Sequence, residues 1–165
     1  MITWIMGILL IASFACFVIY AMRGGKIYIK GDCGYRAGIH MKAYQQHFPV
    51  MVVGGKAGSF LGEYLAGGLI LVLGIGQNGA YPVNNFCGTG MHGGKIFVRG
   101  SFPKENISDN IKVQNLDETD KKELDMYIKK YCKFFNADYD TIMAKPFKKL
   151  VPASSRPYAN LYTPN

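Results

Sequence analysis

The chain has 165 residues, of which 49% are hydrophobic and 18% are charged, so it can bury a core and is not a disordered tail. The formal charge is +8, but the basic residues are spread along the chain and form no block, which argues against a nucleic-acid-binding protein. The four cysteines show no Cys-x-x-Cys or other metal-ligand spacing, and isolated reduced thiols fit a cytosolic protein.

The N-terminal stretch over residues 2–22 reads ITWIMGILLIASFACFVIYAM and contains no charged residue. About 20 apolar residues are enough to span a membrane. The basic residues Arg23 and Lys26 that follow would then leave the bulk of the chain in the cytoplasm. No basic residue precedes the stretch, which disfavours a cleaved signal peptide. Residues 1–20 are therefore expected to be a hydrophobic segment that serves either as a membrane anchor or as a cap on the next domain.

Glycine accounts for 20 residues, and its spacing repeats along the chain. The pattern Gly-x-x-Gly-x-x-x-Gly-x-x-Met over residues 31–41 recurs over residues 55–65 with Leu in place of the final Met. The last part of the pattern, Gly-x-x-Met, occurs a third time at residues 88–91. Short apolar segments that close on Gly alternate with these patterns: KIYIKG, PVMVVGG, LILVLG and KIFVRG. Glycine tolerates the positive φ angles that tight corners need. The repeat therefore predicts strands separated by glycine corners.

The apolar segments place similar residues at matching positions. Each segment has two apolar positions that are two residues apart and therefore lie on one face of a strand. The first position is occupied by Ile27, Met51, Ile70 and Ile96, and the second by Ile29, Val53, Val72 and Val98. A third column is predicted from Met41, Leu65 and Met91. One such strand cannot bury its face alone, whereas stacked layers can. The pattern predicts a mainly β protein, a parallel β-solenoid.

The strand positions that alternate with these, and so point to the opposite face, are also apolar, which is unusual for a free solenoid. They are Tyr28, Val52, Leu71 and Phe97, together with Val50, Leu69 and Leu73 in the middle layers. An exposed apolar stripe of this length is expected to be covered. We predict that the C-terminal helix covers one part of it and another chain covers a different part.

Residues 74–79 read GIGQNG, which matches the dinucleotide-binding string G-x-G-x-x-G after a strand. That motif needs a helix whose N-terminus faces the pyrophosphate. The following residues, AYPVNN, are turn formers, and no acidic residue lies about 20 positions further on. Residues 75–86 are therefore predicted to be an inserted loop and not a nucleotide site.

The tail begins with an amphipathic helix. Leu124, Tyr127, Ile128, Tyr131 and Phe135 recur at helical spacing. Asp117 or Thr119 is expected to cap this helix, which should end near Asn136. A second short helix is predicted over residues 138–144, ending before Pro146. The remaining residues are expected to form an extended arm laid on a surface.

Few residues suggest chemistry. His40, His47 and His92 are not spaced for a metal, and His40 and His92, which adjoin Met41 and Met91, are expected at the surface or at corners. Asp32 is expected to be a turn acid that accepts nearby backbone N–H groups. Glu63 and Arg36 show no partner of a catalytic type in the sequence. We predict no catalytic, cofactor-binding or metal-binding residue in this chain.

The segments MRGGKIYIKGDCGYRAGIHMK, GSFLGEYLAGGLILVLG and CGTGMHGGKIFVRG carry a resemblance. With the tail KPFKKLVPASSRPY, they make residues 20–162 similar to the Gly-repeat (GXGXG) domain at the C-terminal end of the glutamate synthase large subunit. The closest likeness is to versions in which that domain is a separate chain. A related β-helix occurs in one of the subunits of formylmethanofuran dehydrogenase. The chain departs from the pattern at Ile19, where the repeat requires Gly, so its start is either an anchor or the aberrant beginning of a shortened chain.

The resemblance implies a right-handed parallel β-helix. Together with the residue patterns above, the predicted organisation is an N-terminal hydrophobic segment over residues 1–20, β-helix repeats over residues 21–101 with the inserted loop 75–86, and a C-terminal helical and extended tail over residues 102–165. The implied role is a non-catalytic scaffold in an oxidoreductase complex that transfers the amide nitrogen of glutamine to 2-oxoglutarate, with reduction, to give glutamate. FMN and an iron–sulfur centre are expected on the partner chains, a flavin-bearing synthase subunit and a glutamine amidotransferase subunit.

Two other interpretations stay open. The chain could be the scaffold subunit of a formylmethanofuran dehydrogenase-like complex, although the tail Ser-Ser-Arg-Pro-Tyr favours the glutamate synthase type. It could also be a membrane-attached interaction protein, held through residues 2–20, with the bulk of the chain in the cytoplasm.

Overall fold

The computed structural model describes residues 21–77 and 79–154. The predicted N-terminal segment, residues 1–20, lies outside the described residues. The elements in chain order are β1 (Lys26–Ile29), β2 (Val50–Val53), β3 (Ala66–Val72), β4 (Gly93–Arg99), the 3-10 turn η1 (Lys104–Asn106), β5 (Ile111–Gln114), α1 (Glu118–Phe135), α2 (Tyr139–Met143) and β6 (Phe147–Pro152).

Strands β1 to β4 lie parallel and in register, one for each repeat of the sequence. Ile29 pairs with Val53, Val53 with Val72, and Val72 with Val98. The column that begins at Ile27 aligns in the same way. The prediction that like residues of successive repeats stack in columns is therefore confirmed. Met41, Leu65 and Met91 join the same buried core.

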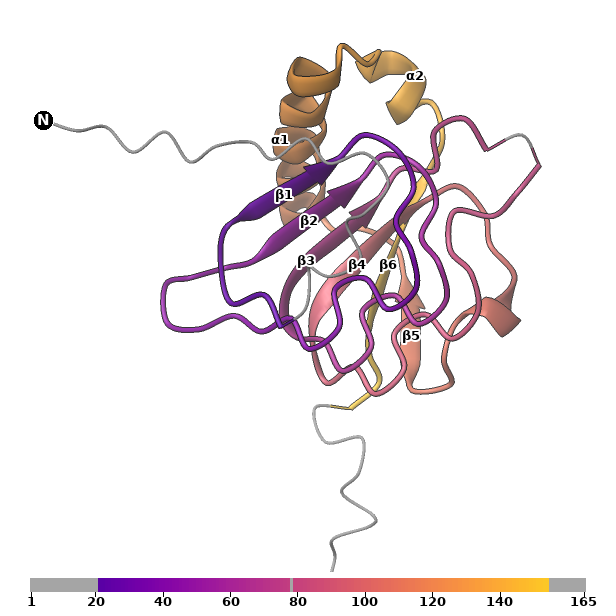
Figure 1. Cartoon of the computed structure of the whole chain (residues 1–165). Helices are drawn as coiled ribbons and strands as arrows, with labels where there is room; N and C mark the ends of the chain where they lie inside the picture. The colour runs from indigo at the N-terminus through magenta and orange to yellow at the C-terminus, as the bar shows by residue number, and fades with distance from the viewer. Residues whose placement is uncertain (1–20, 78, 155–165) are drawn as a thin grey trace, which may run out of the picture.

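The predicted right-handed parallel β-helix is wrong. The six strands form a single mixed sheet in the order β1-β2-β3-β4-β6-β5 (Figure 1). Strand β6 runs antiparallel to β4, and β5 runs antiparallel to β6. The residues expected to form an extended arm include β6, so the tail adds two strands to the sheet.

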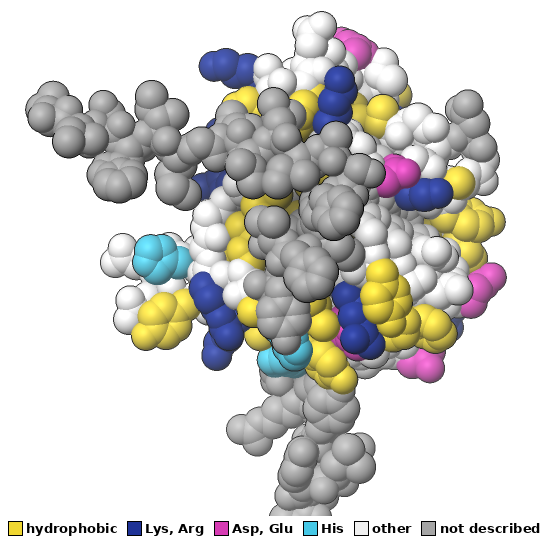
Figure 2. Space-filling view, viewed as in Figure 1, with side chains coloured by type: hydrophobic (Ala, Val, Ile, Leu, Met, Phe, Trp, Pro, Cys, Tyr) yellow, Lys and Arg dark blue, Asp and Glu magenta, His cyan; other side chains and the backbone are white. Residues whose placement is uncertain are grey.

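The loops between the parallel strands explain why they do not build further sheets. In the part of the chain that the structure describes, neighbouring loops pair in a strand-like way only at isolated bridges, such as Cys33 with Ala57 and Ala57 with Val83, and hydrogen bonds between turns join them elsewhere. Left-handed φ angles interrupt the extended backbone at matching turns of each loop. A strand needs several consecutive extended residues, so these segments stay as stacked turns. They cover one face of the sheet, and Figure 2 shows hydrophobic side chains beside Lys and Arg side chains on the visible face.

Two glycines show why the repeat uses this residue. Gly62 has a φ of +64°, and a Cβ there would lie 2.9 Å from Cδ1 of Ile96. Gly54 has ordinary backbone angles, but a Cβ there would collide with the hydroxyl oxygen of Tyr131 and the carbonyl oxygen of Lys30. The first glycine supplies a turn conformation, and the second allows helix α1 to approach the sheet.

Helix α1 has the predicted boundaries. Asp117 caps it by accepting the backbone N–H of Asp120 at 2.8 Å, and the Asp120 carboxylate accepts the N–H of Asp117 at 3.2 Å. Asn136 ends it with a left-handed φ of 51°. Helix α2 lies within the predicted range of residues 138–144, and Asp138 caps it. The reciprocal pair at the start is a capping box, which satisfies two N–H groups that the helix leaves unpaired.

The helices cover the sheet face opposite the loops (Figure 1). Leu124, Tyr127, Ile128 and Tyr131 of α1 and Ile142 of α2 pack on Val52, Leu71 and Phe97. The prediction that the tail helix covers part of the second apolar stripe is therefore confirmed, and the prediction that another chain covers a different part stays a prediction. Within the described residues, no helix is both long enough and apolar enough to cross a membrane. The predicted anchor, residues 2–20, lies outside them.

Candidate functional site

The residues considered for chemistry lie apart from one another. His40, His47 and His92 are exposed, as predicted for His40 and His92. Asp32 accepts the backbone N–H of Lys56 at 2.8 Å and Nε2 of Gln77 at 3.0 Å, so its carboxylate joins separate repeats and does not close a local turn through these bonds. Across residues 21–77 and 79–154, no cluster of three or more His, Cys, Asp or Glu side chains could hold a metal ion.

The loop that carries the G-x-G-x-x-G string opens no helix. Residues 80–86 contain turns and an isolated bridge at Val83. The N–H groups of Gly74 and Ile75 donate to the carbonyls of Gly55 and Gly54. These N–H groups hold residues 74–75 on the preceding layer, and Val83 bridges to Ala57 there, so the residues after Val83 continue the repeating turns.

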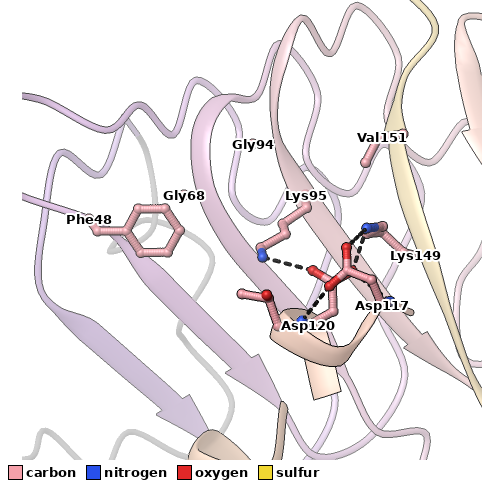
Figure 3. A pocket seen from close by; sticks show the side chains of 9 residues that line it. Phe48, Gly68, Gly94, Lys95, Asp117, Asp120, Lys149 and Val151 are labelled. Carbon is pink, nitrogen blue, oxygen red and sulfur yellow. Dashed lines mark hydrogen bonds and ion pairs between the residues drawn. The ribbon is translucent and has the colours of Figure 1, made fainter. Parts of the chain in front are cut away.

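A charged cluster lies where the start of helix α1 meets strands β4 and β6 (Figure 3). The Asp120 carboxylate lies between two ammonium groups, 3.0 Å from Lys95 Nζ and in contact with Lys149 Nζ. Lys95 Nζ is also 2.5 Å from Glu123, and Lys149 Nζ is 3.1 Å from Asp117. The cluster borders a shallow depression of about 540 Å³ that includes Phe48 and Gly94.

The pKa values of Asp117, Asp120, Lys95 and Lys149 shift in the direction that keeps these four groups charged. Burial opposes ionisation of Asp120, but hydrogen bonds from Lys149 and Lys95 outweigh it and lower the pKa of that carboxyl. The hydrogen bond from the Asp120 backbone and the contact with Lys149 lower the pKa of Asp117 to about 2. The hydrogen bond to Asp120 is the largest cause of the raised pKa of Lys149.

This cluster fastens the helix and does not form an anion site. Two ammonium groups face three carboxylates, so the local charge does not favour a phosphate or carboxylate ligand. Asp120 is 3% exposed, and both lysines are held by it. Each ammonium joins the helix to a strand, which anchors α1 across β4 and β6. The sequence contained no signal for this cluster beyond the cap at Asp117.

A second group of side chains forms a row across the stacked turns on the other face of the sheet. We call Tyr35, Phe60, Phe86 and Arg36 the aromatic column. The Tyr35 and Phe60 rings meet edge to face with centroids 5.4 Å apart, and Phe60 and Phe86 stack at 4.8 Å. The Arg36 guanidinium lies 5.0 Å from the Tyr35 centroid and 5.5 Å from that of Phe60. Cation–π contacts of this kind hold an arginine in a defined orientation.

Arg36 is also held by a carboxylate from the next layer. Its Nε lies 2.9 Å from Oε2 of Glu63, whose side chain is 7% exposed. Among the described residues, that oxygen has the ion pair but no well-aligned hydrogen bond. Each of these two residues was expected to lack a catalytic partner, and the structure pairs them with each other. Aligning the repeats places Glu63 one layer above the turn of Arg36, which is the signal that could have revealed the pair.

The backbone of the aromatic column is strained. Arg36, Phe60 and Phe86 have φ angles of 57°, 62° and 61°. A left-handed conformation costs a non-glycine residue roughly 1–2 kcal/mol. The ring of Phe86 remains 52% exposed, so burial does not fully offset that cost. Such strain tends to gather at functional sites, and sequence reasoning missed this column because its members lie in three separate repeats.

Comparison with known proteins identifies the family. A match to the GXGXG motif covers residues 14–155. The chain belongs to the GXGXG motif family. This membership is consistent with a stand-alone GXGXG domain of the glutamate synthase type, as the sequence resemblance implied. The likeness to formylmethanofuran dehydrogenase stays a prediction.

An uncharacterized protein of Methanocaldococcus jannaschii is 41% identical to this chain over 140 residues. The alignment covers 81% of this chain and 54% of that protein. This GXGXG chain therefore spans about half the length of its relative.

Proposed function

We propose that this chain is a non-catalytic subunit of a glutamate synthase-type assembly, in which it binds the partner subunits and holds them in place. Membership of the GXGXG motif family over residues 14–155 is the observation that carries this proposal, since the domain occurs in the glutamate synthase large subunit. The assembly would transfer the amide nitrogen of glutamine to 2-oxoglutarate, with reduction, to give glutamate. We place it in nitrogen assimilation in the cytoplasm.

The charged groups of the described residues support a structural role for this chain. Lys95 and Lys149 are the ammonium groups nearest the depression at helix α1, and both are engaged by carboxylates. Their raised pKa values keep them protonated, so they are poor nucleophiles or bases. The two lysines at this depression are therefore unsuited to act as the nucleophile or base of an amide transfer.

The cysteines of the described residues do not fit an iron–sulfur centre. Cys33 and Cys87 belong to the core between the sheet and the loops, whereas Cys132 packs in the core between the sheet and the helices. Burial, with a smaller effect from Cys33, raises the pKa of Cys87 to about 12, which disfavours the thiolate that metal binding needs. We therefore assign FMN and the iron–sulfur centre to the partner chains.

The test is reconstitution from the full-length chain and its two partner subunits, one flavin-bearing and one a glutamine amidotransferase. We expect the chain alone to show neither flavin absorbance nor glutamate formation. Adding it to the two partners should raise glutamate formation from glutamine and 2-oxoglutarate, and all three should co-elute on size exclusion.

Three results would contradict the proposal. These are FMN bound to the isolated chain, failure of the chain to bind either partner, and native co-purification with formylmethanofuran dehydrogenase subunits. Membrane fractionation of the full chain, and of a variant that lacks residues 1–20, tests the cytoplasmic placement. Sedimentation of the full chain with membranes that is lost in the shortened variant would support the anchor instead.

A further inference from the structure

The aromatic column includes two positions whose backbone conformation favours glycine. Phe60 and Phe86 hold left-handed φ angles, which glycine adopts without strain. Glycines already occupy the left-handed position two residues later in each turn, at Gly62 and Gly88. The chain therefore keeps two aromatic residues where glycine would relieve strain, and Phe86 remains 52% exposed.

The column has the composition and the rigidity of a binding surface. Aromatic side chains and arginine are enriched among the residues that dominate protein interfaces. The three rings contact one another in sequence, and Arg36 is fixed by two rings and by Glu63. Side chains that are already ordered lose little entropy on binding. The Arg36 side chain is still 47% exposed, so its guanidinium can contact a partner.

We propose that the aromatic column is the docking surface for an acidic partner subunit that presents carboxylates beside apolar side chains. This inference rests on the proposed function, because it names the surface through which the chain joins its assembly. The carboxylates would face Arg36, and the apolar side chains would pack on the rings of Phe60 and Phe86.

The net charge of the whole chain, and not the balance of charges beside the column, favours an acidic occupant over a second copy. The chain carries a formal charge of +8, so a second copy is repelled, whereas an acidic subunit is attracted. The carboxylate nearest the centre of the column, Glu63, is buried and already paired with Arg36. Glu105 and Asp109 border Phe86 at the end of the column, together with Lys104. The acidic partner is therefore expected to centre on Arg36 and Phe60.

The decisive variant is the double substitution Phe60→Gly and Phe86→Gly in the full-length chain. Glycine suits both backbone positions, so the variant should fold with an unfolding midpoint equal to or above that of the wild type. Its affinity for the acidic partner subunit, measured by titrating each partner separately in biolayer interferometry, should fall at least about 10-fold. Wild-type affinity should also fall as the salt concentration rises from about 0.05 M to about 0.5 M.

Two controls lie outside the column. Gln45→Gly relieves a left-handed φ of 52° at another exposed residue, and Tyr44→Ser removes another exposed ring. Both variants should bind the partner as the wild type does. If the double variant does not fold, hydrogen exchange on the wild type answers the same question: the partner should protect amides at residues 59–61 and 85–87.

The outcomes separate this inference from the proposed function. If the wild type binds neither partner, the proposed function fails. If the wild type binds but the double variant binds equally well, or binding leaves those amides unprotected, the docking surface alone is wrong. A dimer of the chain that the double variant disperses, or affinity that salt leaves unchanged, would overturn the choice of an acidic partner.

Discussion

Replacing Asp120 with Asn tests whether the charged cluster fastens helix α1 to the sheet. The Asp120 side chain is 4% exposed and contacts the ammonium groups of Lys95 and Lys149. Asparagine keeps an oxygen that can accept the backbone N–H of Asp117, so the capping box survives. The substitution therefore removes the negative charge and leaves the helix start in place.

The structure sets the size of the effect. Losing one partner of a buried ion pair costs about 3–5 kcal/mol when the remaining charge is stranded. Here Lys95 keeps Glu123 and Lys149 keeps Asp117, so neither ammonium is stranded. A hydrogen bond to a charged group contributes about 1.5–3 kcal/mol. We therefore expect Asp120→Asn to lower the free energy of unfolding by about 2 kcal/mol.

Urea unfolding followed by far-ultraviolet circular dichroism measures this loss. With a denaturant slope of about 2 kcal/mol per molar, the midpoint should fall by about 1 M. The matched control is Glu118→Gln, which removes a carboxylate of the same helical turn that is 82% exposed and paired with Lys121. The control should change stability by less than about 0.5 kcal/mol. If Asp120→Asn has an equally small effect, the reasoning about the cluster is refuted.

Three further outcomes are expected. Gly54→Ala places a methyl group against the hydroxyl oxygen of Tyr131 and should destabilise the fold by about 3 kcal/mol in urea unfolding. In the control Gly31→Ala the added methyl group meets nothing within 4 Å, so the substitution should change stability by less than about 0.5 kcal/mol. Equal losses of stability in the Gly54 and Gly31 variants would contradict the argument. Buried Arg99 donates to three backbone carbonyls, two of them in α2. Arg99→Met should therefore lower the free energy of unfolding by about 3 kcal/mol and speed proteolysis at α2. Unchanged proteolysis would argue against a role of Arg99 in holding α2. The lowered pKa of Asp120 supplies stability that is complete above its unfolded pKa of about 4 and is lost as the pH falls through the folded pKa. Between about pH 6 and about pH 3 the wild-type urea midpoint should therefore drop further than that of Asp120→Asn, and parallel drops would refute the assignment.

Much of the architecture follows from patterns that are local in the sequence. The repeated glycine spacing and the alternating apolar residues predict the four parallel strands and the columns that contain Ile29 and Val53. Asp117 and Asn136 predict the two ends of helix α1, because capping depends on residues within one turn of the helix. The side chains that cover the second face of the sheet follow from the helical period of Leu124, Tyr127 and Ile128.

The tertiary structure alone decided the fold class and the surfaces of the molecule. Strand β6 was missed because Pro146 precedes it and Pro152 ends it, and β5 was missed because it lies outside the glycine repeats that predicted β1 to β4. Their antiparallel pairing turned the predicted solenoid into one mixed sheet. The Arg36–Glu63 pair and the Lys95–Asp120–Lys149 cluster join residues from separate elements. Contacts of this kind depend on which elements become neighbours, and periodicity within one segment carries no information about that.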